Sequence, residues 1–85
     1  MEINENDVGK EFLAALELAI NIRKERRLIY CDSFKEDDVN LLLTILKGKI
    51  NRIEKGLSED KKLDDALDCL NYSCFIATKF MKGGE

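Results

Sequence analysis

The chain has 85 residues, of which 45% are hydrophobic and 36% are charged, with no proline, five glycines and a formal net charge of −3. This composition excludes a disordered chain and predicts one all-α domain, residues 1–85, built from long helices. The mild negative charge gives no general reason to bind duplex nucleic acid, and we expect no such partner.

The first expected helix covers about residues 7–30, with Asn6 or Asp7 as its cap. Its second half carries the basic cluster Arg23-Lys24-Glu25-Arg26-Arg27, which we interpret as a solvated face; the alternative is a phosphate-facing surface. The helix is predicted from apolar residues that recur at spacings of three and four: Phe12, Leu13, Leu16, Ala19, Ile20 and Ile22.

The second expected helix covers about residues 34–55. We predict that this helix starts with a capping box formed by Ser33-Phe34-Lys35-Glu36 and that Gly56 is its C-terminal cap. The acidic run Glu36-Asp37-Asp38 is also interpreted as capping. Spacings of three and four predict a seam that packs on a neighbouring helix: Val39, Leu43, Leu46, Ile50, Ile53 and Leu57. A second stripe on the same helix predicts contact with a second neighbouring helix. This stripe consists of Leu41, Ile45, Lys49 and Arg52.

The third expected helix covers about residues 59–81 and starts at Ser58 or Asp60. From Cys69 to Met81 it is apolar on nearly every side, so it must be surrounded. The short connections predict an antiparallel, up-down-up unit of three helices, which cannot surround this helix alone. A chain this short also buries only about 60–65% of its unfolded surface. We therefore expect self-association, as a dimer or higher oligomer, to complete a helical bundle.

A cluster of aspartates at the start of the third helix is the strongest chemical feature of the sequence. Asp64, Asp65 and Asp68 lie three or four residues apart, close enough on a helix surface to share one Mg²⁺. The alternative is structural: Asp64 and Asp65 complement the helix dipole, and Asp68 forms a salt bridge. Lys49 and Arg52 point to one side of the second helix, where they can pair with these acids or hold a phosphate.

Several chemistries are excluded by what the sequence lacks. It has no histidine, which removes Ser-His and Cys-His nucleophilic schemes within one chain. Three cysteines without CxxC spacing do not indicate a zinc site, and we expect reduced thiols in or near the core. No apolar run approaches the ~20 residues of a membrane span and no secretory segment follows Met1, so we expect a cytoplasmic protein with no membrane partner.

Three segments, taken in order, resemble the small MazG-like proteins of the nucleotide-modification-associated domain type. Together they span about residues 23–78 and follow the family pattern of a tyrosine-glycine-aspartate-serine turn, a basic helix and an aspartate-rich helix. The segments are Arg27-Leu28-Ile29-Tyr30-Cys31-Asp32-Ser33-Phe34, Lys49-Ile50-Asn51-Arg52-Ile53 and Leu63-Asp64-Asp65-Ala66-Leu67-Asp68-Cys69-Leu70-Asn71-Tyr72.

The resemblance implies a helical, oligomeric protein that hydrolyses nucleoside triphosphates to monophosphate and pyrophosphate with Mg²⁺. Asp65 and Asp68 match the ExxD half of the family's metal site, with Tyr30 or Phe34 flanking the base. The EExxE half is missing from the second helix, where bases stand instead, and Cys31 replaces the glycine of the turn. The resemblance therefore implies either a Mg²⁺-dependent pyrophosphohydrolase or a degenerate, non-catalytic nucleotide-binding relative. The alternative function is a non-enzymatic self-association or protein-interaction module.

Overall fold

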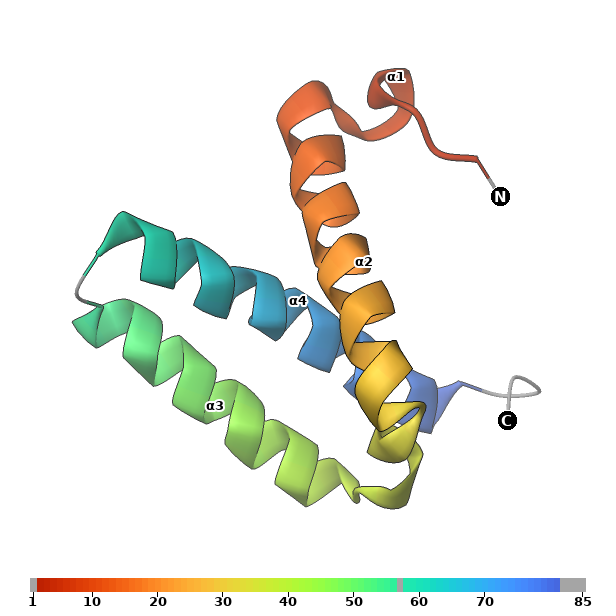
Figure 1. Ribbon diagram of the computed structural model, residues 1–85, viewed down its shortest axis with the longest axis vertical. Coiled ribbons are helices and arrows are strands. Elements are labelled where there is room, and N and C mark those ends of the chain that lie inside the picture. The colour runs from red at the N-terminus through yellow and green to blue at the C-terminus, as the bar shows by residue number, and fades with distance from the viewer. Residues whose placement is uncertain (1, 57, 82–85) are drawn as a thin grey trace.

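The computed structural model describes residues 2–56 and 58–81, and this part of the chain is helical without a strand, which confirms the all-α class (Figure 1). None of the described helices is long and apolar enough to cross a membrane. In chain order the elements are α1 (Glu5–Val8), α2 (Lys10–Tyr30), the 3₁₀ helix η1 (Ser33–Glu36), α3 (Val39–Lys55) and α4 (Glu59–Phe80).

The expected single helix 7–30 is divided into two. Asn4 caps α1, because its side chain accepts a hydrogen bond from the Asn6 N–H while the Asp7 carboxylate accepts one from the Asn4 N–H. Gly9 ends α1 and precedes α2 with a φ of +92°, which glycine adopts without the steric penalty of a side chain. The prediction that Asn6 or Asp7 caps the helix is therefore wrong, because the helical backbone starts earlier and breaks at Gly9.

The expected helix 34–55 is also divided. Ser33 starts η1 without capping it, and Asp37 then adopts an extended conformation before α3 begins. The cap of α3 is Asp38, whose carboxylate accepts a hydrogen bond from the Leu41 N–H at 2.8 Å. The capping box at Ser33 is thus wrong, whereas the capping interpretation of the acidic run is confirmed at Asp38.

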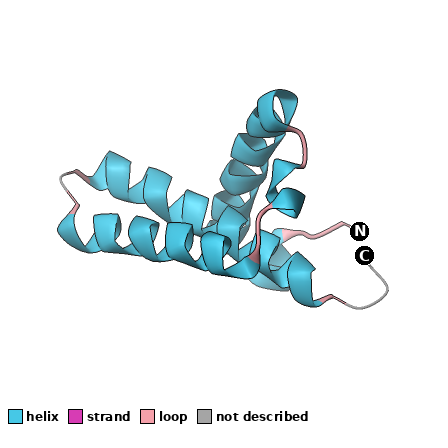
Figure 2. Cartoon of the chain, turned by 90° about the horizontal axis from the view of Figure 1, so that it is seen from below, coloured by secondary structure: helices cyan, strands magenta, loops and turns pink. Residues whose placement is uncertain are grey.

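Helices α3 and α4 lie side by side and antiparallel (Figures 1 and 2). Ser58 caps α4 as expected, since its hydroxyl accepts a hydrogen bond from the Lys61 N–H. Leu42 is fully buried and Leu67 nearly so, which places the centre of the hairpin between them. The predicted α3 seam is correct in part: four of its positions are partly buried (Val39, Leu43, Leu46 and Ile53), but it omits Leu42 and includes Ile50, which is 43% exposed. The last seam position, residue 57, lies outside the described residues.

Helix α2 crosses the hairpin steeply and does not lie parallel to it (Figures 1 and 2). Its C-terminal half rests on α4, where the Ala19 carbonyl accepts a hydrogen bond from Asn71 at 3.0 Å. Its N-terminal half projects away from the hairpin. The up-down-up alignment therefore holds for α3 and α4 only, and the crossing opens a corner between α2, η1 and α4.

Candidate functional site

Asp68 joins three helices. Its carboxylate accepts from Arg26 Nη1 of α2 at 2.9 Å and lies 3.1 Å from Lys49 Nζ of α3. Asp68 is 4% exposed, so it is shielded from water while both partners reach it from the surface. The expected ion pair with Lys49 is present, and Arg26 is a partner that the sequence did not indicate.

A second acid of the cluster is paired in the same way. Asp65 is 5% exposed, and its Oδ2 lies 3.3 Å from Arg52 Nε. Asp64 is exposed on the outer side of α4. Lys49 and Arg52 therefore act here as ion-pair partners, Lys49 partly buried and Arg52 with its side chain 61% exposed.

The aspartate cluster does not fit a shared Mg²⁺ in this arrangement. Mg²⁺ requires oxygen ligands that converge at about 2.0–2.1 Å. Asp65 and Asp68 instead face Arg52, Lys49 and Arg26, and the described residues contain no group of three acids, cysteines or histidines positioned around one ion. The Mg²⁺ assignment to these three acids stays a prediction from their spacing and, for Asp65 and Asp68, from the resemblance.

The segment Tyr30 to Phe34 forms a sharp turn between α2 and η1. Cys31, at the family's glycine position, has φ +52° and ψ −133°, a conformation that favours glycine. Arg23 holds the turn by donating to the Cys31 carbonyl at 3.3 Å and to Asp32 at 2.9 Å. Arg27 donates to both Asp32 oxygens, at 2.8 and 3.1 Å. The turn is thus fixed by two arginines of the helix that precedes it.

Asp32 is expected to make the stability of this turn depend on pH. The hydrogen bond from Arg27 holds the pKa of the Asp32 carboxyl below its usual value, which is about 4. Burial opposes this lowering, and the positive charges of Arg27, Lys35 and Arg23 add to it. Because the pKa is lowered in the folded state, the ion pairs stabilise the fold above about pH 4 and are lost as pH falls through the folded-state pKa. We expect Asp32→Asn to melt at a lower temperature than the wild type at neutral pH, with the gap closing as pH falls through the folded-state pKa of Asp32.

Thermal melts between acidic and neutral pH measure this gap. Glu54→Gln removes an exposed carboxylate of α3 and serves as the control, for which a small gap without pH dependence is expected. An Asp32→Asn gap that persists unchanged at low pH would show that the substitution acts through something other than the carboxylate charge.

An aromatic cluster lies beside the turn. The Phe34 ring of η1 stacks on Phe75 of α4 with centroids 4.3 Å apart, and Tyr72 meets Phe75 edge-on at 5.3 Å. The Arg23 guanidinium lies 5.3 Å from the Phe34 centroid and 5.0 Å from the Phe75 centroid, within cation–π range. These contacts dock η1 onto α4.

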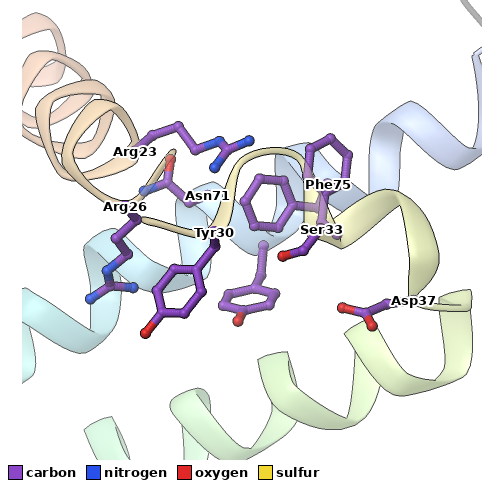
Figure 3. A pocket seen from close by; sticks show the side chains of 9 residues that line it. Arg23, Arg26, Tyr30, Ser33, Asp37, Asn71 and Phe75 are labelled. Carbon is purple, nitrogen blue, oxygen red and sulfur yellow. The ribbon is translucent and has the colours of Figure 1, made fainter. Parts of the chain in front are cut away.

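A cavity of about 440 Å³ opens at this corner, between α2, η1 and α4. Arg23 and Arg26 enter it from one side, and Asp37 lies at the other (Figure 3). Tyr30 and Phe34, predicted to flank a base, both line it. The remaining lining residues are Ser33, Asn71, Tyr72 and Phe75.

The structure brings together only part of the predicted site. Tyr30 and Phe34 share the cavity, whereas Asp64, Asp65, Lys49 and Arg52 do not line it. The interpretation of the basic cluster as a solvated face holds for most of its side chains, which are exposed, but Arg23 is partly buried and Arg26 pairs with Asp68 of α4. The apolar stripe of α2 held the missing signal: Arg23 and Arg26 follow Phe12, Leu16 and Ala19 at spacings of three and four.

The cysteines differ from the expectation of near-core thiols. Cys31 and Cys74 are exposed, and Cys69 is partly buried; all three are free. Burial raises the pKa of the Cys69 thiol, and the charges of Asp65 and Asp68 raise it further. Cys69 is therefore a poor nucleophile, since the thiolate is the reactive form.

Comparison with known protein-family models, with curated proteins and with solved structures gives no match for this chain.

Proposed function

We propose that this protein binds a nucleotide in the cavity between α2, η1 and α4. The observation that supports this proposal is the combination of two guanidinium groups, Arg23 and Arg26, with four aromatic rings around one cavity. Such a cavity suits a ligand that has an anionic end and a flat aromatic end. The resemblance to MazG-like proteins narrows this ligand class to nucleotides.

Arg23 and Arg26 are placed to receive the phosphate. Each guanidinium carries five N–H donors; Arg23 uses some of them on Asp32 and the Cys31 carbonyl, and Arg26 uses one nitrogen on Asp68. The Arg26 side chain is 50% exposed, so donors remain accessible to a ligand. Arginine binds phosphate through two parallel hydrogen bonds, and its interactions here fix its orientation in advance.

The aromatic side chains are placed to receive the base. Phe34 and Phe75 already stack on each other, whereas Tyr30 is 61% exposed at the edge of the cavity. Tyr30 and Tyr72 therefore offer the ring faces for stacking. Asp37 can accept hydrogen bonds from N–H groups on the base edge.

We propose binding without hydrolysis. Metal-assisted phosphoryl transfer needs carboxylates that hold the metal ion and orient water. Asp65 and Asp68 are instead neutralised by three bases, which supports the non-catalytic relative over the pyrophosphohydrolase.

Tyr30→Ala is expected to weaken nucleotide binding about tenfold or more, because the loss of one base-stacking ring is worth about 1–3 kcal/mol. Calorimetric titration with a panel of nucleoside mono- and triphosphates, with and without Mg²⁺, measures the effect. Leu28→Ala is the control, since Leu28 lies two residues away on α2, is 88% exposed and does not line the cavity.

Three results would contradict the proposal. They are no binding at millimolar nucleotide, equal affinity of Tyr30→Ala and wild type, or Leu28→Ala weakening binding as much as Tyr30→Ala. Release of pyrophosphate in the presence of Mg²⁺ would overturn the non-catalytic part and leave the binding site in place.

A further inference from the structure

The N-terminal half of α2 carries apolar side chains that its own chain covers only in part, and even Leu13 and Leu16 are no more than partly buried. Between α2 and α4, the hydrogen bonds and ion pairs of the described residues involve Ala19 or later positions of α2. The half before Ala19 projects beyond the hairpin (Figure 1). Phe12 is 61% exposed there, and Ile20 is 44% exposed.

The amount of exposed surface points to a partner. The chain has an accessible surface of 6760 Å², whereas a folded monomer of its mass has about 5,100 Å². The excess of about 1,600 Å² is larger than the ~800 Å² that each partner buries in a standard interface. Covering the projecting half of α2 would remove part of this excess from water.

The charges along α2 indicate which partner fits. Its first half carries two acids, Glu11 and Glu17, against one base, and its second half carries four bases, including Lys24, against one acid. Glu17 and Lys24 flank Ile20 on the same side of the helix, seven residues apart. A second α2 in antiparallel orientation brings acids next to bases, whereas a parallel one brings like charges together.

We infer that two copies of this chain form a dimer through antiparallel packing of their α2 helices. Ile20 lies at the two-fold axis, opposite Ile20 of the partner subunit, and Leu13 and Leu16 pack on either side. Glu17 of each chain pairs with Lys24 of the partner subunit. The interface is isologous, as expected for a two-fold dimer, and lies on α2, not on the C-terminal part of α4.

Light scattering at micromolar concentration is expected to give twice the 9.7 kDa mass of the chain. Ile20→Glu places two carboxylates at the two-fold axis and is expected to give monomers. Ile29→Glu is the matched control, because Ile29 is 73% exposed on another side of α2, and it should remain dimeric. Circular dichroism of each variant shows whether its helices are retained.

A charge exchange tests the antiparallel register independently of folding. Glu17→Lys and Lys24→Glu are each expected to weaken the dimer at least tenfold, and the double variant is expected to restore it. A monomeric wild type overturns the inference, as does a dimer that survives Ile20→Glu. A double variant that fails to restore association overturns the proposed register.

Discussion

Asp68→Asn is expected to lower the free energy of unfolding by about 2–3 kcal/mol, because it leaves Lys49 and Arg26 without the carboxylate that both contact. In a domain of this size, such a loss corresponds to a fall in melting temperature of about 10 °C or more. Asparagine keeps the shape of the side chain, so the change isolates the charge. Nucleotide binding by the folded protein should weaken without being lost, since Asp68 does not line the cavity but orients Arg26, which does.

Thermal melts with and without Mg²⁺ and a nucleoside triphosphate separate this structural role from a metal-binding role. A Mg²⁺ ligand would give the opposite result: stability would rise as repulsion among the acids is relieved, and the stabilisation by Mg²⁺ plus nucleotide would disappear. Asp64→Asn is the control on the same helix. Because Asp64 is exposed, its substitution should change stability by no more than about 0.5 kcal/mol.

Cys31→Gly is expected to raise the free energy of unfolding by about 1 kcal/mol, which is a gain of roughly 4–8 °C in melting temperature. The φ of +52° with ψ of −133° strains any residue that has a Cβ atom, and glycine relieves the strain. The greater freedom of glycine in the unfolded chain offsets part of the gain. Differential scanning calorimetry under reducing conditions measures the net effect.

Cys31→Ala distinguishes backbone strain from the chemistry of the thiol. Alanine keeps the Cβ atom and removes the sulfur, so it should leave the melting temperature close to that of the wild type. If Cys31→Gly destabilises the protein, or if Cys31→Ala gives the same gain, then strain at this turn does not explain the effect.

The features that the sequence predicted correctly are local or depend on one helix pair. The Ser58 cap follows from residue type, and the pairing of Asp68 with Lys49 follows from two antiparallel helices joined by a short turn. The all-α class follows from periodicity and from the absence of proline.

The features that could not be predicted from the sequence depend on how α2 crosses the hairpin of α3 and α4. Arg26 reaches Asp68 only because of this crossing, and the cavity exists only at the corner that the crossing opens. Periodicity gives the apolar side of a helix but not its angle to a neighbour. The full burial of Leu42 was missed for a related reason. The three consecutive leucines at positions 41–43 are compatible with several apolar stripes, and the packing against α4 determines that Leu42 is the buried one.

The distribution of contacts along the chain also has a kinetic consequence. Helices α3 and α4 are neighbours in sequence, so their hairpin closes a short loop, whereas the Arg26–Asp68 and Asn71–Ala19 contacts span 42 and 52 residues. We therefore expect the hairpin to form early and α2 to dock late. The cavity, which needs Arg23 and Arg26 beside Tyr72 and Phe75, would then be assembled in the final step of folding.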